Sequence, residues 1–203
     1  PRQARFPAEL LLEASERLVA DVGPAALTIE GLSRASGAPV GSIYHRFPSR
    51  DIILARLWLR TVRDFQTGFI EAIRKPNPAE AALAAAMHTP RWCRRHPERA
   101  QVLMLYRQRD LVAAGLPEHL NNEIAAVNQS MSEALADLAY RLFGRRTGGA
   151  RRRCLVAVVD IPYAAVRRYL ADGRPVPDDL DAMIATAVRA VLSDEQHANP
   201  SRR

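Results

Sequence analysis

Residues 27–54 read LTIEGLSRASGAPVGSIYHRFPSRDIIL, and this stretch decides the fold. Thr28 is a good N-cap for a short helix that carries apolar residues on one side. Gly37 follows, where a sharp bend favours a residue without a side chain. A second short helix then runs from Pro39 to about His45, since proline is tolerated in a first turn. Two short helices joined by a glycine turn predict a helix-turn-helix.

The second short helix has the features of a recognition helix. An α-helix fits the major groove of B-DNA, and residues near its N-terminus read base edges there. Gly41 and Ser42 are small, so they allow this helix to approach the bases closely. A tyrosine and a histidine at its end carry hydrogen-bonding tips that suit phosphate oxygens. The motif therefore predicts binding to double-stranded DNA.

The same stretch resembles the signature of the TetR (tetracycline-repressor) family. In that family the recognition helix ends in a tyrosine, followed shortly by a phenylalanine and then by a basic residue that opens a long connecting helix. Tyr44, Phe47 and Arg50 stand at these positions, and the spacing from Thr28 through Gly37 agrees as well. The recognisable signature covers roughly residues 8–58, about a quarter of the chain. The resemblance implies an all-helical homodimer that binds pseudo-palindromic operator DNA and is released by a small molecule.

Two features depart from the family pattern. Gly31 lies inside the first helix of the motif, where glycine costs up to about 1 kcal/mol relative to alanine. Pro39 and Val40 stand where the family often has polar residues, so we expect base reading to use thymine methyl groups and Ser42. The residues predicted to contact DNA are Thr28, Pro39, Val40, Gly41, Ser42, Tyr44, His45 and Arg50.

Composition narrows the class of protein. The hydrophobic fraction of 48% is that of a globular chain. No apolar run approaches the roughly 20 residues needed to span a bilayer, and no secretory signal is visible. Cys93 and Cys154 form no CxxC motif, which suggests a reduced compartment and a cytoplasmic location. The net charge is +7, yet residues 1–50 hold six Arg and five Asp or Glu, a balance of only +1. Charge alone therefore does not mark the DNA-binding end.

Helical periodicity continues along the chain, and no alternating strand pattern stands out. The predicted fold is all-α with about nine helices. A three-helix DNA-binding domain over residues 1–48 precedes a helical effector-binding and dimerisation domain over residues 49–203. The helices outside the motif are expected over about residues 7–22, 50–75, 79–95 with a kink at Pro90, 97–114, 117–143, 151–170 and 178–192.

The last two helices predict a two-fold homodimer. The helix from Cys154 to Leu170 is apolar nearly all round, and one chain of this size cannot easily cover every face of it. The final helix carries an apolar stripe from Leu180 to Val191. We expect the two helices to pair with their symmetry mates as a four-helix bundle, as the resemblance also implies.

The resemblance places an effector pocket among the middle helices, between about residues 80 and 170. Such pockets are mostly apolar with a few polar anchors. Asp160 interrupts the most apolar helix, so we expect it to be buried and paired, with Arg167 as the candidate partner. The candidate lining residues are His88, Trp92, Tyr106, Asn128, Met131, Asp160 and Tyr163.

Other kinds of site are not favoured. His88 and Cys93 point about 140° apart on one helix, which argues against a metal site with His96. No arrangement of catalytic groups or phosphate-binding glycine loop stands out, so neither an enzyme nor a cofactor is expected. The arginine run over residues 141–153 is interpreted as a solvated loop. Two alternatives remain: a constitutive or architectural DNA-binding regulator without a ligand, and a helical enzyme or interaction module with an accidental motif.

Overall fold

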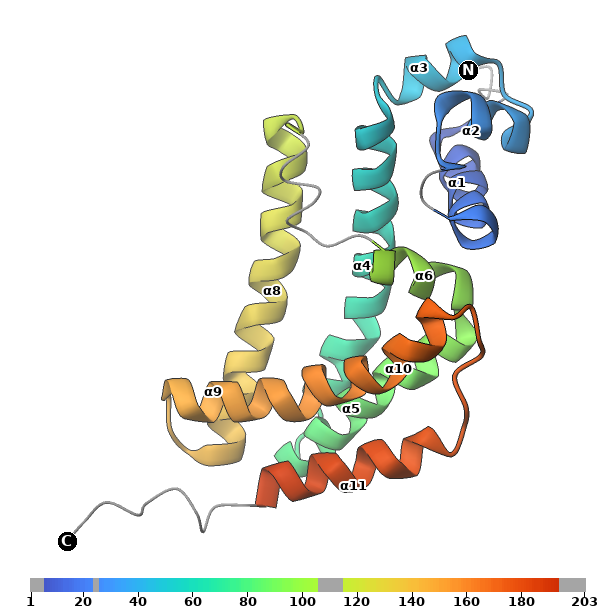
Figure 1. The fold of residues 1–203 in the computed structure, drawn as a ribbon. Helices are drawn as coiled ribbons and strands as arrows, with labels where there is room; N and C mark the ends of the chain where they lie inside the picture. The colour runs from blue at the N-terminus through green and yellow to red at the C-terminus, as the bar shows by residue number, and fades with distance from the viewer. Residues whose placement is uncertain (1–5, 24–25, 106–114, 194–203) are drawn as a thin grey trace, which may run out of the picture. The chain divides into compact units, whose positions relative to one another are not determined.

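The computed structural model describes residues 6–23, 26–105 and 115–193 (Figure 1). Every regular element in these ranges is helical, which confirms the all-α prediction with its N-terminal helix-turn-helix. No helix among the described residues is long and apolar enough to cross a membrane. The helix predicted over residues 97–114 is seen as far as Leu105, and Tyr106 lies outside the described residues.

The chain forms two compact units. The first comprises Pro1–Asp64 and His96–Val127, and the second comprises Phe65–Arg95 and Asn128–Arg203, in each case for the residues described. These units do not follow the predicted boundary at residues 48 and 49, because the start of the connecting helix packs with the N-terminal helices. The functional division into DNA-binding and effector domains stays a prediction.

The first unit holds the helix-turn-helix and the helices that support it. Its core is apolar and includes Leu11, Leu32, Ile43 and Leu57, all of them fully buried. Helices α1 and α2 pack on each other, and α6 packs on α1. The elements of this unit are α1 (Ala8–Val22), α2 (Ile29–Ser36), α3 (Val40–Arg46), the first part of α4 (Arg50–Ile73), α6 (Pro97–Leu105) and the first part of α8 (Glu118–Phe143).

Local signals in the sequence fix the ends of these helices. The Thr28 hydroxyl accepts a hydrogen bond from the Gly31 N–H at 2.9 Å and so caps α2. Gly37 ends α2 with a φ of 69°, a left-handed conformation that favours glycine. The Ser49 hydroxyl accepts from the Ile52 N–H at 3.3 Å at the start of α4. These three positions confirm the predicted caps and the predicted turn.

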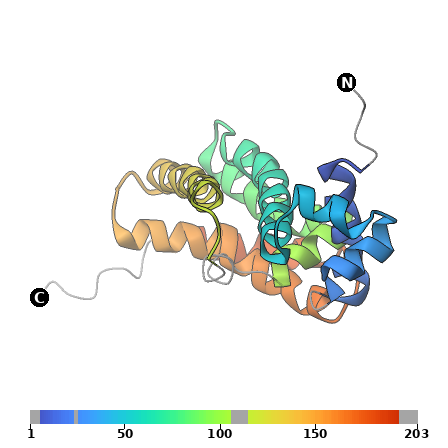
Figure 2. The ribbon, with the colours of Figure 1, turned by 90° about the horizontal axis from the view of Figure 1, so that it is seen from above.

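The second unit is built around helix α5, against which α10 and α11 pack. Figures 1 and 2 show α9, η2 and α10 as one continuous helical run. Arg94 joins the end of α5 to the start of α11, because it donates to Asp181 at 2.8 Å and to the Pro177 carbonyl at 3.0 Å. The elements are the end of α4, α5 (Pro78–Arg95), the end of α8, α9 (Gly148–Leu155), the π-helical turn η2 (Val156–Asp160), α10 (Ile161–Ala171) and α11 (Leu180–Ser193).

Two prolines lie within these helical runs. Pro90 is buried inside α5, which continues past it to Arg95. Pro162 opens α10 directly after the π-helical turn. A proline has no N–H to donate, and its ring clashes with the carbonyl four residues earlier, here that of Val158. The wider π turn over Val156–Asp160 relieves this clash and keeps the run continuous.

Candidate nucleic-acid interface

Helix α3 is anchored on one side and exposed on the other. Ile43 is fully buried and Phe47 is 4% exposed, so both hold α3 against the core of the first unit. The opposite side carries Val40, Gly41 and Tyr44, and Tyr44 is 51% exposed. Nothing lies within 4 Å of the position where a Cβ of Gly41 would stand. The free side of α3 is therefore open to a large partner.

The structure adds one basic residue to the predicted set. Arg46 is exposed at the C-terminal end of α3, next to His45. A guanidinium there suits a phosphate contact, since phosphate groups take most of the protein–DNA hydrogen bonds. The signal was present in the sequence, because Arg46 directly follows two predicted contact residues. Residues Thr28, Pro39, Val40, Gly41, Tyr44 and His45 are exposed, and Ser42 and Arg50 are half-buried.

Two serines hold the turn between α2 and α3. The Ser33 hydroxyl donates to the Ala38 carbonyl oxygen at 2.7 Å. The Ser36 hydroxyl donates to the Leu32 carbonyl oxygen at 2.6 Å and accepts from the Ala38 N–H at 3.2 Å. Both side chains thus satisfy backbone groups that the turn leaves without helical partners. The angle between the two helices is fixed by these bonds together with Gly37.

Close packing explains why residue 31 is a glycine, which the sequence alone did not show. A Cβ at this position would collide with the Ala26 carbonyl oxygen and come within 3.1 Å of the Thr28 hydroxyl. The backbone of α2 therefore approaches the preceding segment more closely than any other residue type allows. Glycine lowers the helix propensity of α2, but it allows this close packing.

Arg50 has a structural partner inside the first unit. Its Nε donates a hydrogen bond to the Leu27 carbonyl oxygen at 2.6 Å. Its Nη1 lies 3.7 Å from the Asp51 carboxylate. The side chain thus connects the start of α4 to the segment before α2, a role that motif spacing alone did not indicate. Contact of Arg50 with a phosphate stays a prediction.

Ion pairs hold α1 to α4 and α6. Arg60 of α4 lies 3.0 Å from Glu9 and 3.8 Å from Glu13. Arg99 of α6 donates to Glu16 at 2.9 Å and to Asp64 at 3.2 Å. Burial lowers the pKa of Arg99, but its hydrogen bonds and charge interactions with Glu16 and Asp64 outweigh this and raise it. The helices behind the recognition helix are therefore fastened by charged contacts as well as by apolar packing.

A second charged cluster joins α4 to α8. The Glu123 carboxylate accepts from Arg63 at 2.7 Å and from Arg56 at 2.8 Å. The hydrogen bond from Arg63, followed by that from Arg56, lowers the pKa of Glu123 below its usual value despite partial burial. One carboxylate thus bridges two arginines that lie two helical turns apart on α4.

Two of the predicted effector-binding residues lie in an aromatic cluster of the second unit. The His88 ring lies 5.0 Å from Phe65, and Trp92 lies 5.3 Å from Phe65, both edge to face. His88 Nε2 lies 2.9 Å from the Phe65 carbonyl oxygen, within hydrogen-bonding distance. A Cβ on Gly68 would lie 2.5 Å from the His88 ring, so the glycine makes room for it. A role of His88 and Trp92 in ligand binding stays a prediction.

The other predicted effector-binding residues that the structure describes lie on α8, η2 and α10. Asn128 and Met131 are half-buried on α8. Asp160 is exposed, and Tyr163 is 40% exposed. The expectation that Asp160 is buried and paired with Arg167 is therefore wrong, because its carboxylate reaches solvent on the outer side of the helical run. Periodicity alone had placed it on a helix without an exposed face.

In the described part of the chain, the cysteines and the metal-binding side chains form no further site. No group of three or more His, Cys, Asp or Glu among the described residues could hold a metal ion. Cys93 and Cys154 are buried, and burial raises the pKa of each thiol to about 12. Both cysteines are therefore protonated packing residues at neutral pH.

The geometry defines a helix-turn-helix whose second helix, α3, has an exposed face. Residues 11–57 match the model of the bacterial regulatory proteins of the tetR family. This match confirms the resemblance seen in the sequence and shows that the segment is a DNA-binding helix-turn-helix of the TetR type. No curated protein matches the chain in sequence.

Solved structures share the fold over almost the whole chain. The fatty acid degradation regulator FadR from Bacillus halodurans matches with a TM-score of 0.70 at 12% identity, over 97% of this chain and 100% of that one. FadR from Bacillus subtilis, in complex with stearoyl-CoA, gives 0.69 at 15% identity, over 92% and 98%. The TetR-family regulator PfmR from Thermus thermophilus gives 0.67 at 16% identity, over 90% and 96%. At these identities the likeness shows the fold.

Proposed function

We propose that this protein is a homodimeric repressor that binds a pseudo-palindromic operator through α3 and leaves it when a small molecule binds. The exposed face of α3, from Pro39 to Arg46, carries the proposal. Ile43, Phe47 and the serine bonds hold that face in place before DNA arrives. A preorganised recognition helix loses little freedom on binding, which favours affinity.

Exposed apolar residues on α10 and α11 support the homodimer. Met183 is 62% exposed on α11, and Tyr163 is 40% exposed on α10. Residues Leu155, Val156, Val159 and Ile161 of the same helical run are only half-buried within one chain. Apolar side chains that one chain leaves uncovered suit a symmetric partner. A dimer would place two recognition helices about 34 Å apart, in successive major grooves.

Release by an effector is supported by two observations. One relative, FadR from Bacillus subtilis, forms a complex with stearoyl-CoA. The second unit of this chain contains a cavity of about 630 Å³, a size typical of small-molecule sites. A constitutive regulator without a ligand is the alternative. It predicts an operator affinity that a broad panel of lipophilic compounds leaves unchanged.

Selection of duplexes from a random library by the purified protein tests the DNA-binding proposal. We expect a pseudo-palindrome with half-sites one helical turn apart, bound by a dimer in sedimentation. Tyr44→Ala should weaken binding at least tenfold, because it removes an exposed contact of α3. Tyr140→Ala is the matched control, since Tyr140 is 43% exposed on α8. A monomer at micromolar concentration, or equal binding by both variants, would contradict the proposal.

A further inference from the structure

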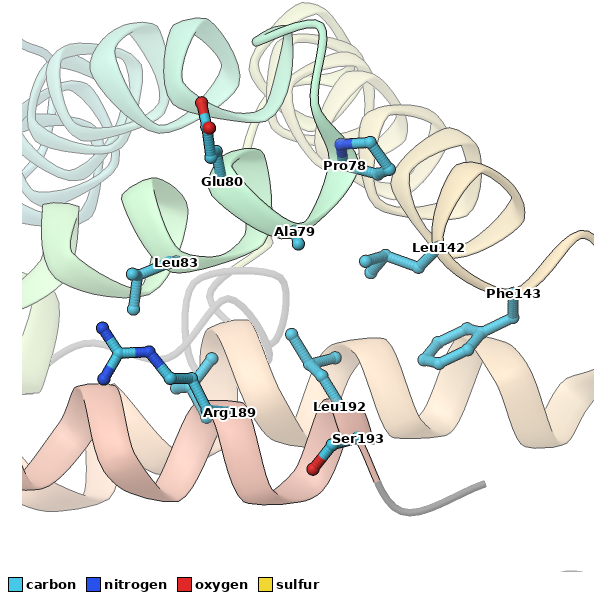
Figure 3. Close-up of a pocket in the computed structure, with 10 residues that line it drawn as sticks. Pro78, Ala79, Glu80, Leu83, Leu142, Phe143, Arg189, Leu192 and Ser193 are labelled. Carbon is cyan, nitrogen blue, oxygen red and sulfur yellow. The ribbon is translucent and has the colours of Figure 1, made fainter. Parts of the chain in front are cut away.

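The cavity of the second unit lies where three helix ends meet (Figure 3). The start of α5, the end of α8 and the end of α11 supply its walls. Most of the lining is apolar: Leu83, Leu142, Phe143, Val188 and Leu192. A volume of about 630 Å³ accommodates a molecule of drug size, and an apolar lining favours a hydrocarbon or aromatic body.

The two charged side chains that line the cavity point in different directions. Arg189 and Glu80 both line the cavity and both are exposed. Figure 3 shows the Arg189 guanidinium beside Leu83, whereas the Glu80 carboxylate points away from Leu192. Neither side chain forms an ion pair with another residue in the described part of the chain. The guanidinium is therefore the charged group that is available to a molecule in the cavity.

A second arginine, Arg153, contacts Phe143, which is one of the residues that line the cavity. The Arg153 guanidinium stacks over the Phe143 ring at 5.4 Å, and its Nε donates to the Val191 carbonyl oxygen. Its Nη2 is buried and has no hydrogen-bond partner in the described structure. A buried donor without an acceptor is unfavourable, and more so when it is charged. An anion near Phe143 would reduce this cost.

We infer that this cavity is a binding site for a lipophilic monoanion, a carboxylate with an apolar body of about ten to twenty heavy atoms. The apolar body packs against Leu142, Phe143 and Leu192. The carboxylate pairs with Arg189, whose planar guanidinium matches a carboxylate with two parallel hydrogen bonds. Arg153 adds positive potential from its position over the Phe143 ring.

A single negative charge suits this site better than two. Arg189 is the only cationic side chain among the described residues that line the cavity, so a second carboxylate would have no partner there. A cationic amphiphile would meet both arginines, which disfavour it. The site stands on its own as a binding site. Its regulatory role rests on the proposed release of operator DNA.

Calorimetry of the full chain with decanoate, 1-decanol and decylammonium tests the site. Decanoate should bind at least tenfold more tightly than 1-decanol, and decylammonium should bind least. Arg189→Gln should weaken decanoate binding about tenfold and leave 1-decanol unchanged. Ala79→Trp should abolish binding of both, because Ala79 lines the cavity and a large ring fills it. Thermal unfolding confirms that each variant is folded.

Variants of Arg153 and Arg152 separate the effect of a positive charge near the cavity from the effect of the overall positive charge of the protein. Arg153→Gln should weaken decanoate binding several-fold, and Arg153→Lys should restore most of it. Arg152→Gln is the matched control, because Arg152 is exposed on the same helix. Equal binding of decanoate and 1-decanol, loss of affinity in Arg152→Gln equal to that in Arg189→Gln, or unchanged binding to Ala79→Trp would each overturn the site.

Operator binding measured with and without decanoate then tests the regulatory role separately. A decrease in operator affinity that Ala79→Trp removes supports both the site and the proposed release. Binding of decanoate with unchanged operator affinity keeps the site and rejects its role in release. Absence of decanoate binding by a folded protein that still binds its operator rejects the site and leaves the DNA-binding proposal intact.

Discussion

The Nε atom of Arg50 donates a hydrogen bond to the carbonyl oxygen of Leu27 over 2.6 Å. This bond joins the first residue of α4 to the segment that precedes α2, across 23 positions of sequence. Leu27 is fully buried, so the carbonyl is held firmly by its surroundings. Arg50 thus positions the helix-turn-helix whether or not it also touches a phosphate.

Replacing Arg50 by alanine should therefore have two effects. It should lower the free energy of unfolding by about 1–2 kcal/mol, because a hydrogen bond from a charged group to a buried carbonyl is lost. It should also weaken binding to every operator variant by a similar factor and flatten the salt dependence by about one unit per subunit. Arg17→Ala, at an exposed position of α1, is the control. Urea unfolding and fluorescence anisotropy measure the two effects, and an unchanged unfolding midpoint would argue against the positioning role.

Specificity should depend on a different part of α3. Val40 is 40% exposed and Ser42 is half-buried near the N-terminus of the helix. Residues at this end read base edges, whereas contacts to phosphates position the protein without selecting sequence. Val40→Ala and Ser42→Ala should therefore change which base is preferred, by about 1–3 kcal/mol at the contacted position. Binding to a panel of single-base operator variants measures this, and a uniform loss over the panel would assign these residues to positioning.

Two glycines of the helix-turn-helix should respond in opposite ways to alanine. Gly31→Ala should lower the melting temperature, because the new methyl group collides with the Ala26 carbonyl oxygen. Gly41→Ala should raise stability by up to about 1 kcal/mol, because open space surrounds that position and alanine favours a helix. Thermal unfolding of both variants decides the point. Stabilisation by Gly31→Ala would show that the backbone shifts to accept the methyl group.

Gly31 also shows where prediction from sequence stops. Helix caps are local, so Thr28, Gly37 and Ser49 could be assigned from the residues beside them. The close approach of Gly31 to Ala26 depends on how the chain returns before α2, and residue type alone does not contain that information. For the same reason, motif spacing identified the exposed face of α3 but not the bond from Arg50 to Leu27.

The second unit shows the same limit for periodicity. An apolar helix predicts burial on all sides, yet the run that contains Asp160 leaves that residue exposed in one chain. The cavity near Arg189 is assembled from helix ends that lie far apart in sequence, and no local pattern indicates it. His88 and Trp92 could be identified as aromatic wall candidates, but their packing against Phe65 is visible only in three dimensions.

The contact between α4 and α8 should weaken in acid. The pKa of Glu123 is lowered in the folded protein, so the carboxylate stabilises the fold above its unfolded pKa of about 4.5. This contribution is lost as the pH falls through the lower, folded value. Glu123→Gln should therefore be about 1 kcal/mol less stable than the wild type at pH 7, and the difference should shrink as the pH falls from about 5 to about 3. Glu133→Gln, at an exposed position of α8, is the control. A difference that persists at pH 3 would indicate a packing effect.

The contact between α6 and α1 should depend on both of its charges. Glu16 is 7% exposed, and its Oε2 is buried without a hydrogen-bond partner, so among the described residues Arg99 supplies the hydrogen bond to this carboxylate. Arg99→Met should destabilise the protein by about 3 kcal/mol, because it leaves an uncompensated buried carboxylate.

The double variant Arg99→Met, Glu16→Leu should recover most of this loss, since an apolar pair can replace a buried ion pair of similar volume. Urea unfolding of the wild type, both single variants and the double variant gives the coupling energy between the two side chains. If the two losses simply add, Arg99 acts through Asp64 or through packing of its stem, and the connection of α6 to α1 does not rest on Glu16.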